Sequence, residues 1–154
     1  MRFVATPWVE PERPTRVEAW LAHTVRAVVR VPLLRRVLLS PVVARPGFWF
    51  ATTVAFLWGC LLLGWFRRRD GLPGRLHYFC RLPSWAYGRG GTTIGAIYLT
   101  GDNDADAVLA HEDVHVGQWR RYGLAFIPLY VAAGGLARTN RFEVEAGLEG
   151  GGYL

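Results

Sequence analysis

The chain has 154 residues, of which 51% are hydrophobic and 19% charged, and its formal net charge is +6. This length allows one modest domain and an appendage, and the apolar composition favours a protein that meets a membrane. Residues 1–90 carry 14 Arg against four acids and residues 91–154 carry four Arg against eight, yet the basic part contains no nucleic-acid-binding module, so anionic lipid rather than nucleic acid is the expected partner.

Residues 1–46 are predicted to form a basic amphipathic N-terminal region. Residues 1–14 contain three prolines and are expected to be extended. From Thr15 to Leu39, apolar residues recur at helical spacing and the arginines fall largely between them. A basic helix containing Trp20 fits the interface of a membrane, and the alternative is a soluble helix that packs on the domain.

Residues 47–66 form a run of twenty residues without a charge. A helix of this length spans the hydrocarbon core of a bilayer. Aromatic residues stand at both ends, and Arg67, Arg68 and Arg69 follow directly, as at membrane interfaces. We therefore predict one transmembrane helix at Gly47–Phe66 and a single-pass location in a membrane; a buried core helix is the alternative.

Residues 71–154 are predicted to form a separate small domain, because the turn-rich stretch at 70–74 follows the span. The stretches 75–82 and 92–100 have strand character and are expected to pair as a hairpin across the loop between them. A helix is predicted at 105–122, with N-cap residues at 102–104 and Gly123 as its stop. The predicted fold class is α+β and mostly helical.

The C-terminal part begins with the apolar stretch 123–137, which is too short to span a bilayer comfortably. Two arrangements remain open for it: a re-entrant or interfacial hairpin, or core packing against the preceding helix. Asn140 then begins a short helix predicted at 141–149.

The predicted helix at 105–122 contains the motif His-Glu-x-x-His at residues 111–115. Two histidines four residues apart project from one face of a helix, so both imidazoles can reach one Zn²⁺. Glu112 lies between them and can accept a proton from a water activated by the metal. The sequence therefore predicts a zinc site at His111 and His115 with Glu112 as general base.

A catalytic zinc ion takes three protein ligands, and two downstream carboxylates are candidates for the third. Glu143 is preferred over Glu145, which points to another side of the same helix. The alternative for Glu143 is a capping box, in which Asn140 is the N-cap and Glu143 the N3 residue. Gln118, one turn after His115, and the hydroxyls of Tyr98 and Tyr122 are weaker candidates for contacts with a ligand or substrate.

These motifs resemble the gluzincin class of zinc metallopeptidases, in which His-Glu-x-x-His is completed by a Glu on a later helix. The segment Asn140–Ala146 resembles the Glu-x-x-Ala-Asp segment of membrane-embedded members. His115–Gln118 resembles small bacterial His-Glu-x-x-His domains that have Gln three residues after the second His. The resemblance covers roughly residues 90–147 and implies Glu143 as third ligand. It departs at Gly147, where the class has an Asp that orients a ligand.

The sequence thus predicts a membrane-anchored zinc peptidase in a bacterial plasma membrane, acting on a protein or peptide substrate. The first alternative is a metal-binding membrane module without hydrolytic activity. The second is a basic membrane protein in which the motif is accidental. The oligomeric state is left open.

Overall fold

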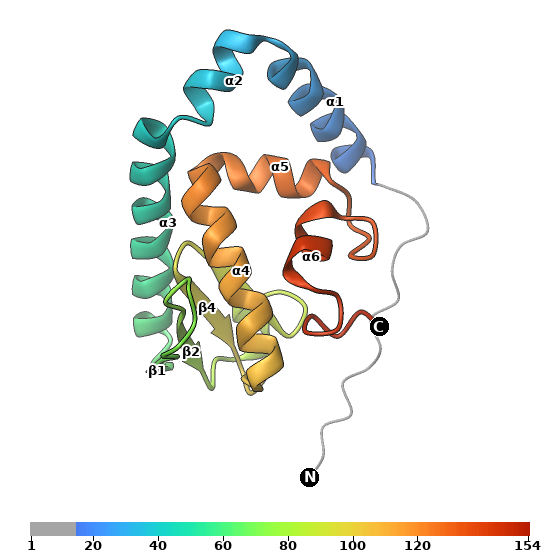
Figure 1. The fold of residues 1–154 in the computed structure, drawn as a ribbon. Helices are drawn as coiled ribbons and strands as arrows, with labels where there is room; N and C mark the ends of the chain where they lie inside the picture. The colour runs from blue at the N-terminus through green and yellow to red at the C-terminus, as the bar shows by residue number, and fades with distance from the viewer. Residues whose placement is uncertain (1–14) are drawn as a thin grey trace.

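The computed structural model describes residues 15–154, so the predicted extended segment 1–14 lies outside the described residues. Within residues 15–154, three helices form an arch around a compact unit of one sheet and three further helices (Figure 1). In chain order the elements are α1 (Arg16–Arg30), α2 (Pro32–Leu38), α3 (Pro41–Leu61), β1 (Trp65–Arg68), β2 (His77–Cys80), η1 (Ser84–Ala86), β3 (Gly91–Ile94), β4 (Ile97–Thr100), α4 (Asp106–Tyr122), η2 (Gly123–Ala125), α5 (Phe126–Ala132) and α6 (Arg141–Ala146).

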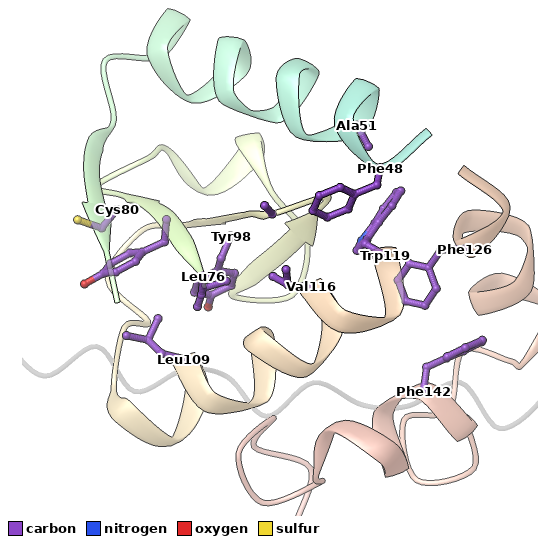
Figure 2. Close-up of a cluster of buried hydrophobic side chains, with 12 residues drawn as sticks. Phe48, Ala51, Leu76, Cys80, Tyr98, Leu109, Val116, Trp119, Phe126 and Phe142 are labelled. Atoms are coloured by element: carbon purple, nitrogen blue, oxygen red, sulfur yellow. The ribbon is translucent and has the colours of Figure 1, made fainter. Parts of the chain in front are cut away.

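The four strands form one sheet in the order β1-β2-β4-β3. β2 and β4 are parallel, whereas the two outer pairs are antiparallel. β4 is buried along its whole length, and its side chains alternate between two layers, as strand geometry requires. Ile97 and Leu99 pack with Ala55 of α3, whereas Tyr98 packs with Val116 of α4. The sheet therefore lies between α3 and α4 (Figure 2).

Aromatic packing fixes the last helices against the end of α4. The ring of Trp119 lies 5.2 Å from that of Phe126 in α5, and Phe126 lies 5.1 Å from Phe142 in α6, measured between centroids (Figure 2). The indole N–H of Trp119 also donates to the carbonyl of Thr93 in β3 at 2.9 Å. Of the two arrangements open for residues 123–137, core packing is the one observed for Phe126.

The predicted α+β class agrees with the structure, but the predicted transmembrane helix at Gly47–Phe66 is wrong. Only Gly47–Leu61 of that run is helical, about 22 Å at 1.5 Å per residue, whereas a bilayer core is about 30 Å thick. No single helix in residues 15–154 has the length and apolarity to cross a membrane; α2 and α3 do together, but they are bent by 45° at their junction.

Tertiary contacts explain why the charge-free run is divided. Gly59 and Gly64 both lie against Phe79 of β2, where a Cβ would come within 2.4 Å and 3.1 Å of its ring. Between them Leu63 takes a left-handed conformation (φ 55°), which ends the helix. Trp65 and Phe66 then enter β1, and α3 buries one face against the domain. Packing against the domain accounts for the burial of that face of α3.

The hairpin expected between residues 75–82 and 92–100 is also wrong. β2 and β4 from these two stretches are parallel, and the second stretch is itself a hairpin, β3 and β4, that turns at Gly95 and Ala96. Gly95 has φ 62° and lies against Thr52 of α3, so a side chain there would clash with the helix backbone. The contact of Gly95 with α3 joins residues far apart in the chain, so no sequence periodicity indicates this turn.

α4 runs over nearly the predicted residues and ends at Gly123, which has a positive φ of 55°. Its start differs from the expectation: the N-cap is Ala105, without a side-chain cap, rather than one of residues 102–104. Asp106 in the first turn pairs with Arg69 at 3.0 Å and complements the helix dipole.

The linker before β2 is held to α4 by a buried contact at Gly74. The amide of Gly74 donates to Asp113 at 2.7 Å, and Arg120 donates to the Gly74 carbonyl at 2.6 Å. A Cβ at Gly74 would lie 2.4 Å from a carboxylate oxygen of Asp113 and 2.7 Å from its backbone oxygen. We expect Gly74→Ala to lower the free energy of unfolding by about 1–3 kcal/mol in urea denaturation.

Gly117→Ala is the matched control, because Gly117 lies inside α4 and a Cβ there meets no atom within 4 Å. This change should raise the free energy of unfolding by up to about 1 kcal/mol through helix propensity. Equal stability of the two variants would contradict the role given to the Gly74 contact.

Candidate metal centre

α4 brings His111 and His115 together on its buried side. Their exposed fractions are 3% and 7%, and their Nε2 atoms lie 3.2 Å apart. The four-residue spacing places the two rings one turn apart, edge to face, on the same side of the helix, as the motif predicted. The remaining neighbours of this pair come from later parts of the chain.

α6 supplies the third group, Glu143, which is 2% exposed. One carboxylate oxygen, Oε2, lies 3.2 Å from Nε2 of His111 and 3.6 Å from Nε2 of His115. Asn140 caps α6 by accepting from the amide of Phe142 at 3.0 Å, but the Glu143 side chain faces the histidines. The capping-box alternative for Glu143 is therefore wrong.

The hydrogen bonds of the imidazoles determine which ring nitrogens carry protons. Nδ1 of His111 lies 2.8 Å from the carbonyl of Gly147, which only accepts, so this nitrogen donates. Nδ1 of His115 lies 2.7 Å from Oε1 of Gln118. The amide nitrogen of Gln118 donates to the Phe142 carbonyl, so its oxygen accepts from His115. In neutral imidazoles, neither Nε2 atom then carries a proton, and each presents a lone pair.

Three lone-pair atoms therefore converge at one point: two imidazole Nε2 atoms and Oε2 of Glu143. Among residues 15–154, this buried oxygen accepts no hydrogen bond while the two imidazoles are neutral. Three buried acceptors facing one another are unfavourable unless a proton or a metal cation lies between them. His111, His115 and Glu143 are thus a buried group that could hold a metal ion.

The spacing of the three atoms fits a small tetrahedral ion. Bonds of about 2.0–2.1 Å at the tetrahedral angle place neighbouring ligand atoms about 3.3–3.4 Å apart. The corresponding distances here are 3.2, 3.2 and 3.6 Å. Nitrogen and oxygen donors of this kind are ligands that several first-row metal ions accept.

Two contacts outside the ligand group orient the histidines, and one of them comes from Gly147, where the sequence departs from the resembled class. Gly147 lacks the Asp side chain that the resemblance implied, and its backbone carbonyl accepts from Nδ1 of His111 and orients that ring. Gln118, a weaker candidate, orients His115. Glu145 accepts from Gln118 at 3.1 Å and does not face the histidines.

Tyr130 of α5 is a site residue that the sequence analysis did not find. Its hydroxyl donates to Oε1 of Glu143, and burial together with the Glu143 charge raises the pKa of Tyr130. Burial would raise the pKa of Glu143 as well, but the contacts with His111 and His115 outweigh it and hold that pKa well below its usual range. No periodicity or motif marks Tyr130, because its partner lies on another helix.

Glu112, the predicted general base, points toward β3 and lies beside the group. Its Oε2 accepts from the hydroxyl of Thr93 at 2.7 Å. Burial raises the pKa of Glu112, and the neighbouring His115 and the Thr93 hydrogen bond oppose this rise. Burial lowers the pKa of His115, but Glu143 and Glu112 outweigh it and the net shift is upward. Negative charge around the imidazoles therefore favours a cation at this position.

The C-terminal residues cover the group from another side. A Cβ at Gly151 would lie 2.8 Å from the His111 ring, and the Tyr153 ring is 6.2 Å from that ring between centroids. Tyr98 and Tyr122, the two tyrosines that the sequence suggested for this site, have other contacts. Tyr98 donates to the Asn103 carbonyl at 2.9 Å, and Tyr122 packs against Phe142.

Removing the Tyr130 hydroxyl is expected to weaken metal binding without unfolding the chain. Loss of an outer hydrogen bond to a ligand typically costs about 10–100-fold in metal affinity, so Tyr130→Phe should show that loss in a competition titration with a chromogenic chelator. Tyr122→Phe is the control, because the Tyr122 ring packs in the core against Phe126 and Phe142. Equal affinities for the two variants would contradict the role of Tyr130.

Searches of protein-family models, curated proteins and solved structures found no match to this chain. The class of the site therefore follows from its geometry, as a buried His-His-Glu group with a neighbouring glutamate.

Proposed function

We propose that this chain is a zinc-dependent peptidase. The convergence of two Nε2 atoms and a carboxylate oxygen at one buried point is the observation that carries the proposal. Three protein ligands of this kind are typical of catalytic zinc sites, which keep a fourth position for water. The metal ion, when bound, would activate that water and polarise the carbonyl of the substrate.

The residues of the chain have separate roles in this proposal. His111, His115 and Glu143 hold the ion, and Gly147, Gln118 and Tyr130 orient these ligands. Glu112 accepts the proton of the attacking water and delivers it to the leaving amine. Thr93 holds the Glu112 carboxylate by its hydrogen bond.

A second candidate function is metal binding without hydrolysis. The burial of the three ligands to 7% exposure or less favours it, because a catalytic ion needs an open position for substrate. An ion between α4 and α6 would then fasten these helices together. This alternative shares the ligands with the peptidase and differs in the role of Glu112.

The experiment is metal analysis of the purified chain followed by reconstitution. We expect one zinc per chain, and hydrolysis of a mixed peptide library that is lost with a chelator and restored by zinc. Because the ion binds only the folded state, it should raise the free energy of unfolding by about 4 kcal/mol when free zinc is at about 1,000 times its Kd. Its removal should therefore lower the Tm by about 10 °C. If the purified chain contains no metal and its Tm does not change when zinc is added, both functions are contradicted.

A further inference from the structure

A groove separate from the metal centre is lined mainly by residues of α1, α2 and α5; Figure 1 shows how these helices are arranged. It is open, has a volume of about 860 Å³, and has an apolar floor that includes Val25 and Val29 of α1 and Leu129 of α5. A second hollow of about 490 Å³ shares Val29 and Leu129 with it and continues toward the end of α4. The two hollows thus form one surface.

Among residues 15–154, six exposed arginines and no acidic residue line this surface, which we call the arginine groove: Arg26, Arg30, Arg35, Arg36, Arg121 and Arg141. In residues 15–154, the two ion pairs between Arg and carboxylate involve other arginines. Arg121 and Arg141 lie instead over the rings of Tyr122 and Phe142. Like charges gathered in this way repel one another, and a bound anion would relieve that repulsion.

Exposed apolar side chains lie on the same helix as two of the arginines. On α2, Leu33 is 71% exposed and Val37 is 49% exposed, and Arg35 and Arg36 lie between them in the sequence. Val42, at the start of α3, is 81% exposed. Arginine interleaved with exposed aliphatic residues is typical of helices that lie in a membrane interface. A nucleic acid would engage the arginines but leave these aliphatic side chains in water.

We propose that the arginine groove binds the phosphate headgroup of an anionic phospholipid, while the apolar side chains of α2 enter the bilayer interface. Guanidinium groups match phosphate oxygens in charge and geometry, and the apolar floor fits the start of an acyl chain. α5 joins this surface to the metal centre, since Leu129 is in the groove and Tyr130 contacts Glu143. The proposal does not depend on hydrolysis at the metal centre.

The test is co-sedimentation of the full chain with vesicles. We expect binding to mixed phosphatidylcholine–phosphatidylglycerol vesicles and little binding to phosphatidylcholine alone. Each Arg at an anionic surface contributes about a fivefold factor, so the double variant Arg35→Glu/Arg36→Glu should weaken binding by at least about 30-fold. Its Tm should not fall, because the change relieves repulsion between like charges, and its zinc content should be unchanged.

The control is Arg67→Glu/Arg75→Glu, which makes the same charge change at two exposed positions outside the groove. It should retain most of the binding. Equal losses in the two double variants would overturn the proposal in favour of a general charge effect. Displacement from vesicles by millimolar inorganic phosphate would show a free-anion site instead, and tighter binding to duplex DNA than to vesicles, lost in the groove variant, would show a nucleic-acid site.

Discussion

Replacing Glu112 by Gln is expected to leave zinc bound and to abolish peptide hydrolysis. Gln has nearly the shape of Glu, and its carbonyl oxygen can still accept from Thr93, which now donates to Glu112 at 2.7 Å. Neither histidine nor Glu143 is altered, so zinc content and Tm should match those of the parent chain. An amide cannot take up the proton, and loss of a general base typically costs about 10²–10⁴-fold in rate.

The measurement pairs zinc content with turnover of a cleaved peptide, and Glu149→Gln is the control. Glu149 is exposed and lies outside the group, so its amide variant should retain full activity. Normal turnover of Glu112→Gln, with equimolar zinc, would rule out Glu112 as the base. If the parent chain binds zinc but hydrolyses no peptide, the non-catalytic alternative holds.

Replacing Glu143 by Ala is expected to produce the largest loss of metal affinity. The change removes one of three atoms that meet within 3.6 Å of one another. A direct ligand contributes more than an outer contact, so the loss should exceed the roughly 100-fold that outer contacts reach. Isothermal titration of the metal-free protein with zinc, in competition with a chelator, measures it.

Glu145→Ala separates ligation from a general effect of removing acids from α6. Glu145 meets the site through Gln118, which it accepts a hydrogen bond from, and is not itself a ligand, so its variant should stay within about tenfold of the parent affinity. Retention of tight zinc binding by Glu143→Ala, with loss in Glu145→Ala, would transfer the third-ligand role to Glu145.

Local sequence determined the elements that carry the candidate site. The His-Glu-x-x-His spacing placed His111 and His115 on one side of α4, because the period of a helix is fixed. Thr15 begins α1 with a capping box, and Gly123 ends α4; both signals depend on residues a few positions away. Glu143 could be selected as a candidate but not separated from a capping role.

The features that depend on non-local contacts were determined only by the tertiary structure. The charge-free run at 47–66 has the composition of a span, yet Phe79 packs where its helix ends. The Tyr130 hydroxyl and the Gly147 carbonyl reach the site from other elements, and a backbone carbonyl has no sequence signature at all. Periodicity and caps act over a few residues, whereas these contacts join residues 13 or more positions apart. The sequence alone could therefore predict the histidine pair but not the contacts of Tyr130 and Gly147 with the site.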